Sequence, residues 1–180
     1  MQRRNFLIST ALATTVGQKA FSKTSNKDGF IVKSGENRLG EHTPFMGINP
    51  NDVKISSKDT DGQLSVFEYI GNQKVGPSLH IHFYQDEIFY VAEGEYTFQL
   101  GEKKSKLKAG DTIFLPRNIQ HTWIQTSDHG KLIYLLQPAG KMEEFFLNMN
   151  RLKSRPTEEE MNKIHAAHGM KVVGPPMTLE

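Results

Sequence analysis

Three histidines and one glutamate have a spacing that could build a metal site. His80 and His82 lie two residues apart in a strand-like segment, and side chains alternate across a strand, so both imidazoles should point to one face. Glu87 follows after four residues, where a short connection would fold its carboxylate back beside them. His121 opens a later strand. Three imidazoles and a carboxylate that face inward can bind a divalent first-row metal and leave room for water or substrate.

Order and spacing carry this prediction, because a lone histidine in a strand is more often an ordinary core or surface residue. The same four donors accept Mn, Fe, Co, Ni, Cu or Zn, so the pattern predicts one divalent transition-metal ion without naming it. The chain has no cysteine, which excludes disulfides, zinc–thiolate sites and a cysteine nucleophile.

The candidate metal ligands must be positioned by strands. The chain around them consists of short segments rich in Val, Ile, Phe, Tyr and Thr, which are separated by glycine-containing turns. This pattern is typical of an antiparallel sandwich or barrel, and we expect an all-β domain over residues 61–140. Phe30–Val32 could form a short first strand, and the lysines of 103–108 should form a solvated hairpin that protects an edge. The strands of the domain are predicted at 64–70, 79–83, 87–93, 95–100, 111–115, 121–126 and 131–137.

Residues 141–180 are expected to form a helical extension. Apolar residues from Met142 to Met149 recur with helical spacing. Thr157 and Glu160 form a capping-box pattern for a second helix, which should end at Gly169.

The four candidate ligands stand in an order that resembles the two cupin motifs. The first motif has His-x-His, three or four residues, Glu, six residues and Gly, which His80, His82, Glu87 and Gly94 match. The second motif places Gly, Pro, Gly, His and Asn at fixed intervals; the corresponding residues are Gly110, Pro116, Asn118, His121 and Gln125. The resemblance covers about residues 64–140 and implies a double-stranded β-helix, that is, a jelly-roll barrel.

The sequence departs from the cupin motifs at three positions, none of which is a candidate metal ligand. Asn118 replaces the motif glycine, and asparagine tolerates the left-handed backbone region, so the turn should survive. Gln125 replaces the final asparagine, a structural position, and Lys74 stands where the leading glycine of the first motif would fall.

Two further segments, 86–95 and 137–146, resemble the small quercetin 2,3-dioxygenase-like group of cupins. Phe89 lies two residues after Glu87, and Trp123 lies two residues after His121, so alternation should place both rings inward beside the metal. They could form an aromatic substrate pocket, or they could simply fill the core of the barrel.

Three functions remain open at this level, because fold does not fix function. The resemblance implies a dioxygenase acting on a hydroxylated aromatic, with Glu87 as both metal ligand and base. A metal-dependent isomerase or epimerase could use the same site but needs a second base, for which no candidate stands out. A non-catalytic cupin that binds a small molecule or a metal is the third.

The N-terminal segment predicts export. Residues 1–22 combine Arg3-Arg4-Asn5-Phe6-Leu7, which resembles a bacterial twin-arginine signal, with an apolar stretch too short to span a bilayer. We therefore expect a periplasmic protein with no lasting membrane span after signal removal. Residues 23–60 are expected to be a linker and an N-terminal arm.

Composition limits the partners. Hydrophobic residues make up 37% and charged residues 23% of the 180 residues, which is ordinary for a globular domain. The formal net charge is only +2, so no broad basic field for nucleic acid is expected. A small-molecule substrate is the expected partner, and residues 29–33 could supply an arm to a second copy in a homodimer.

Overall fold

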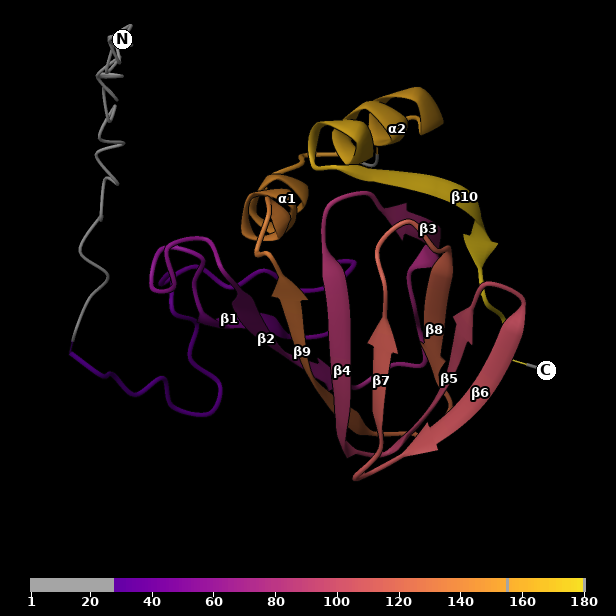
Figure 1. The fold of residues 1–180 in the computed structure, drawn as a ribbon, viewed down its shortest axis with the longest axis horizontal. Helices are drawn as coiled ribbons and strands as arrows, with labels where there is room; N and C mark the ends of the chain where they lie inside the picture. The colour runs from indigo at the N-terminus through magenta and orange to yellow at the C-terminus, as the bar shows by residue number, and fades with distance from the viewer. Residues whose placement is uncertain (1–27, 155, 180) are drawn as a thin grey trace, which may run out of the picture.

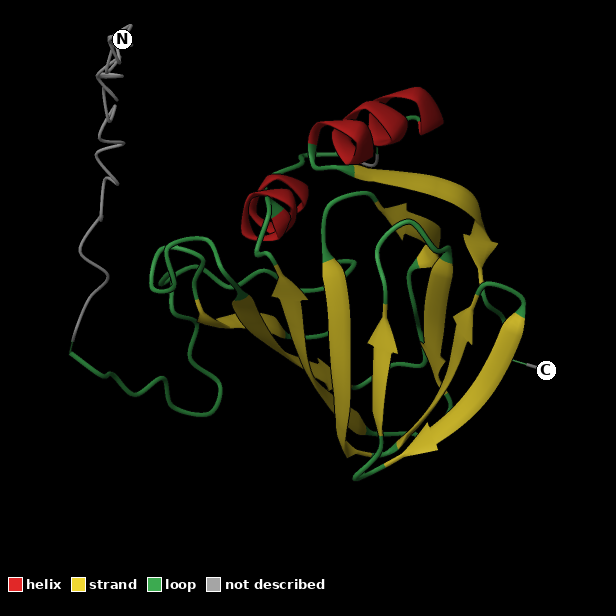
Figure 2. Ribbon diagram, in the orientation of Figure 1, coloured by secondary structure: helices red, strands yellow, loops and turns green. Residues whose placement is uncertain are grey.

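The computed structural model describes residues 28–154 and 156–179, which form two antiparallel sheets and two helices (Figures 1 and 2). The first sheet has the order β1 (Asn51–Ile55), β2 (Ser65–Gly71), β9 (Gly130–Gln137), β4 (Asp86–Glu93), β7 (Thr112–Leu115). The second has the order β10 (Met170–Pro176), β3 (Ser78–His82), β8 (His121–Gln125), β5 (Glu95–Leu100), β6 (Lys103–Lys108). The helices are α1 (Met142–Asn150) and α2 (Glu158–Ala167). The signal segment predicted at 1–22 lies outside the described residues.

The all-β prediction is confirmed: the two sheets face each other as a double-stranded β-helix (Figure 1). Among the described residues the sheets are not hydrogen-bonded into one closed barrel. Alternation in β2, β4 and β9 sends one set of side chains into the space between the sheets. The core there is aromatic: the rings of Phe67 and Tyr134 stack at 4.9 Å, and those of Phe89 and Tyr134 at 5.0 Å.

Three strands differ from expectation. The strand predicted at Phe30–Val32 is wrong, because this segment pairs with no strand. β1 forms instead at 51–55 and pairs with β2, so the first sheet begins within the range predicted as linker and arm. β10 follows the two helices and pairs with β3, so the C-terminal extension ends in a strand rather than in helix alone.

The predicted start and end of the second helix and the lysine-rich edge are confirmed. Thr157 accepts a hydrogen bond from the backbone of Glu160, whose side chain accepts one in return, so the capping box at the start of α2 is complete. Gly169 follows the helix with a φ of 76°, a left-handed conformation that favours glycine. The lysine-rich segment 103–108 forms the edge strand β6, with four exposed lysines.

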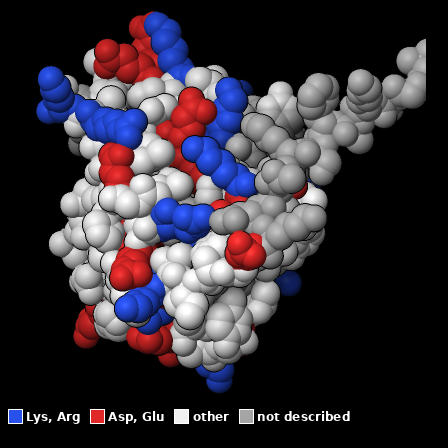
Figure 3. All heavy atoms as spheres, turned by 90° about the vertical axis from the view of Figure 1, so that its left-hand side faces the viewer, with Lys and Arg blue, Asp and Glu red and all other residues white. Residues whose placement is uncertain are grey.

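Basic and acidic side chains are interspersed on the face drawn in Figure 3. Within the described part of the chain, no helix is long and apolar enough to cross a bilayer. The predicted absence of nucleic acid among the partners stays a prediction.

Asn118 adopts the left-handed backbone that its place in the second motif requires, with a φ of 66°. Its backbone N–H donates to the carbonyl oxygen of His82 at 2.8 Å, which ties this turn to β3. We predict that Asn118→Ala lowers the free energy of unfolding by about 1–2 kcal/mol, the cost of a left-handed residue with a Cβ. Asn118→Gly should be close to neutral, since glycine adopts this conformation freely. Urea unfolding of both metal-free variants tests this, and equal stability of the two would contradict it.

Candidate metal centre

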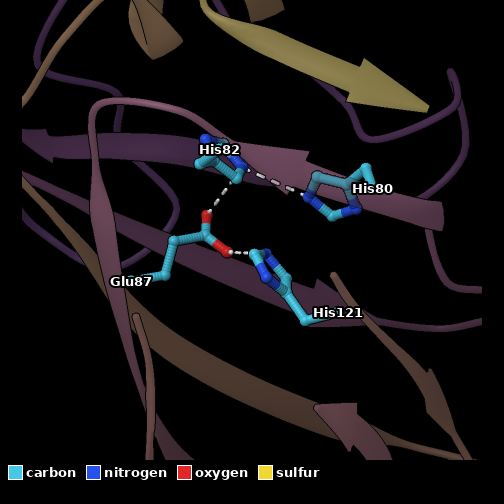
Figure 4. A group of neighbouring side chains, drawn as sticks. All are labelled: His80, His82, Glu87 and His121. Atoms are coloured by element: carbon cyan, nitrogen blue, oxygen red, sulfur yellow. Dashed lines mark hydrogen bonds and ion pairs between the residues drawn. The ribbon is translucent and has the colours of Figure 1, made fainter. Parts of the chain in front are cut away.

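The four predicted ligands converge from both sheets (Figure 4). His80 and His82 lie on β3, and His121 lies on β8, where its Cα pairs with that of His80. Glu87 comes from β4 in the opposite sheet, brought back by the short connection 83–85. The site therefore bridges the two sheets: three imidazoles on one side face a carboxylate on the other. This is the arrangement that strand alternation and the short connection predicted.

The distances within the cluster fit a shared ion. His80 Nε2 lies 3.2 Å from His82 Nε2, and the Glu87 oxygens lie 3.6 Å from His82 Nε2 and 3.1 Å from His121 Nε2. Ligand atoms about 2.0–2.2 Å from one ion are separated by about 2.9–3.5 Å in octahedral or tetrahedral geometry. One ligand atom from each residue lies within 4.8 Å of all the others. In the described part of the chain, no second group of His, Asp or Glu meets this criterion.

Two of the three imidazoles are fixed through their far nitrogens. His80 Nδ1 lies 2.8 Å from the carbonyl oxygen of Ser78, and His121 Nδ1 lies 2.9 Å from that of Ile119. A carbonyl only accepts, so each Nδ1 must carry the hydrogen, which leaves the Nε2 lone pair for a metal. Such outer hydrogen bonds set the orientation of metal-bound imidazoles.

The electrostatics of the cluster favour neutral imidazoles at two positions. Burial lowers the pKa of His80 to about 3, and burial also lowers the pKa of His82. Both rings are therefore neutral, as a metal ligand must be.

Glu87 and His121 behave as a charged pair. Burial alone would raise the pKa of Glu87, but the histidines, His82 first, lower it to about 2. Burial lowers the pKa of His121, but the hydrogen bond and the charge of Glu87 outweigh it and raise this pKa overall. A metal would take the place of the proton that the pair shares, so binding should release a proton.

An ion pair that the sequence pattern did not mark holds the two motifs together. Arg117 donates to the carboxylate of Asp86 through Nε at 3.0 Å and through a terminal nitrogen at 2.6 Å, and its backbone N–H donates as well at 2.8 Å. Asp86 precedes Glu87, and Arg117 lies in the turn before His121. The pair therefore fixes the approach to two ligands at once. The adjacency of these residues to the ligands is the only signal that could have suggested it.

Phe89 and Trp123 point inward, as alternation predicted, and their ring centroids lie 6.4 Å apart. Both are buried, with exposed fractions of 3% and 6%, within a larger cluster of core aromatics. Trp123 also packs against Tyr69 at 5.0 Å. The structure thus places both rings in the core, and a substrate pocket beside them stays a prediction.

Gln125 shows how the chain tolerates a departure from the second motif. Its side chain is fully buried, and its amide nitrogen donates to the carbonyl oxygens of Gly71 at 3.1 Å and Ser127 at 2.9 Å. A Cβ on Gly71 would lie only 1.5 Å from Gln125 Oε1. The longer glutamine therefore fits because residue 71 has no side chain.

Comparison with known proteins agrees with this geometry. A model of the cupin domain family matches residues 65–136. Quercetin 2,3-dioxygenase of Bacillus subtilis is 30% identical over 118 residues, which cover 65% of this chain and 33% of that relative. An uncharacterized protein of Methanocaldococcus jannaschii is 40% identical over 43 residues, covering 24% of this chain and 34% of the relative. The chain spans about a third of the length of each of these relatives.

A solved structure shows the same fold. KdgF from Halomonas sp. superposes with a TM-score of 0.54 at 17% identity, over 64% of this chain and 98% of that chain. At this identity the likeness concerns the fold alone. The two facing sheets, the four converging side chains and the match to the family model together show that residues 65–136 form a cupin domain.

Proposed function

We propose that this cupin is a metal-dependent dioxygenase that acts on a small hydroxylated aromatic, with Glu87 as both metal ligand and base. The observation that carries the proposal is the position of the Glu87 carboxylate. It is 5% exposed, and its two oxygens face different histidines, His82 and His121. One oxygen can therefore keep its contact while the other accepts a proton. The likeness to a quercetin 2,3-dioxygenase supports the choice of substrate class.

A divalent ion held by His80, His82, Glu87 and His121 would act as a Lewis acid and lower the pKa of a bound substrate hydroxyl. Glu87 then accepts that proton: the substrate O–H bond breaks, and a carboxyl O–H bond forms on Glu87. Because the pKa of Glu87 is about 2 among the histidines, the carboxylate is a weak base until one of its contacts loosens. Arrival of the substrate oxygen supplies that change.

The rest of the chain shields this proton transfer. His82 and His121 are each 1% exposed, so little water reaches the cluster from their side. His80 is less completely buried than His82 and His121. We therefore propose that substrate enters beside His80. In this proposal Phe89 and Trp123 contact the aromatic ring, which requires that the core around them opens on binding.

Localisation and assembly belong to the same proposal. We propose export to the periplasm through the segment 1–22, and a homodimer in which residues 29–33 reach a second copy. Ile31 supports the latter, since it is an apolar side chain with 86% of its surface exposed.

Oxygen uptake tests the proposed reaction. Protein loaded in turn with Mn, Fe, Co, Ni, Cu and Zn should consume O₂ with at least one flavonol or catechol, and both atoms of ¹⁸O₂ should appear in the product. His129→Ala, which removes an exposed histidine outside the cluster, is the matched control and should keep the activity. If no metal and no polyphenol supports uptake, the isomerase or the non-catalytic binding function takes its place.

A further inference from the structure

His82 differs from the other two histidines in the partner of its far nitrogen. The Nδ1 atoms of His80 and His121 face backbone carbonyl oxygens. His82 Nδ1 is buried and has no hydrogen-bond partner among the described residues. A buried ring N–H without an acceptor is costly, and a metal-bound imidazole usually has one.

The side chain of Gln85 offers a candidate acceptor. It lies three residues after His82, in the connection between β3 and β4, and its side chain is 2% exposed. Its Oε1 is also buried without a partner in the described structure. Burial lowers the pKa of His82, and Gln85 partly opposes this effect. When a metal occupies His82 Nε2, the ring hydrogen must be on Nδ1, so His82 Nδ1 is then a donor and Gln85 Oε1 an acceptor.

The backbone at both ends of the two-helix segment packs against Gln85. A Cβ on Gly140, just before α1, would lie 1.7 Å from Gln85 Nε2 and 2.5 Å from its Cδ. On another side, a Cβ on Gly169, between α2 and β10, would lie 3.9 Å from Gln85 Oε1. The backbone of Gly169 accepts a hydrogen bond from Phe83 N at 2.9 Å, which fixes the same connection. The helices and β10 lie beside this end of β3 and β4 in Figure 1.

We propose that Gln85 is a positioning residue for the metal centre: its Oε1 accepts a hydrogen bond from His82 Nδ1–H and directs His82 Nε2 toward the ion. Gly140 and Gly169 form the cradle that orients the amide. The extension thereby acts on a metal ligand that it does not itself contain. This inference rests on the metal site of the proposed function, but not on the reaction catalysed there.

Affinity for zinc tests the positioning role of Gln85. By competition with a chromophoric chelator, Gln85→Leu should bind Zn²⁺ about 10–100-fold more weakly, as is typical when an outer partner of a ligand is lost. Gln85→Glu keeps an acceptor at the same place and should bind at or above the wild-type affinity. Equal weakening in both variants would mean that Gln85 only packs, and would refute the positioning role. Wild-type protein that binds no zinc would refute the proposed metal-dependent function, whereas zinc binding that is unchanged in Gln85→Leu would refute only the role of Gln85.

Two glycines provide a matched pair that leaves Gln85 itself intact. Gly140 and Gly101 have φ values of 58° and 59°, so an alanine costs the same backbone strain at both. A Cβ at Gly101 meets nothing within 4 Å, whereas at Gly140 it displaces the Gln85 amide. Gly140→Ala should therefore weaken Zn²⁺ binding and Gly101→Ala should not. Equal affinities in the two variants would count against the cradle.

Discussion

His82→Ala should remove most of the bound metal, whereas wild-type protein should carry close to one divalent ion per chain. The variant deletes one of four ligands at a cluster whose members come from two sheets, and the three remaining side chains cannot replace it. The loss should exceed the factor of about 10–100 that is typical for partners outside the first coordination sphere. Metal content by mass spectrometry, followed by chelator competition, measures it.

His129→Ala is again the matched control, since it removes a half-exposed histidine that pairs with Glu93 outside the cluster. It should retain the full metal content. Circular dichroism of metal-free His82→Ala separates loss of a ligand from loss of the fold. Wild-type protein that stays metal-free after incubation with Mn, Fe, Co, Ni, Cu and Zn would refute the metal site altogether.

The ligand cluster could be predicted because its logic is local. His80 and His82 lie on one face because side chains alternate along a strand. The connection to the next strand is short, so Glu87 must lie beside them. His121 needed the second motif, because its register with His80 depends on the pairing of β3 with β8. The capping box of Thr157 and Glu160 could be predicted for the same reason, since it involves only four consecutive residues.

The features that escaped prediction depend on contacts between distant segments. β10 ends in Gly174-Pro175-Pro176, a composition that indicates a turn, and it becomes a strand by pairing with β3. Phe30–Val32 has strand-forming side chains but finds no partner strand. Alternation sets the inward direction of Phe89 and Trp123, yet whether they line a pocket depends on how the opposite sheet packs on them.

Gln85 illustrates the same limit at a single position. Neither its residue type nor its position in the sequence indicates a role at the metal site, because a glutamine in a loop is ordinarily solvated. It is buried where Gly140, just before α1, and Gly169, just after α2, come close to its side chain. A role that depends on two glycines far along the chain becomes visible only in three dimensions.

Glu87→Gln should retain metal and yet turn over substrate at least about a hundredfold more slowly, within the range of about 10²–10⁴ usual for loss of a general base. Glutamine preserves the size of the side chain and one ligating oxygen, but its amide cannot accept the substrate proton. The change also removes the charge that raises the pKa of His121. His121 should therefore lose its proton more readily in the metal-free variant, which helps it to bind the ion.

The measurement is the rate of O₂ consumption at saturating metal, with the metal content determined on the same sample. Glu93→Gln is the matched control: it lies on the same strand, β4, but its side chain is half exposed and pairs with Lys131 and His129. It should keep the wild-type rate. A Glu87→Gln protein with full metal content and an undiminished rate would show that Glu87 is a ligand only. The proton would then have to leave the substrate by another route, and the proposed mechanism would be wrong even if the metal site is right.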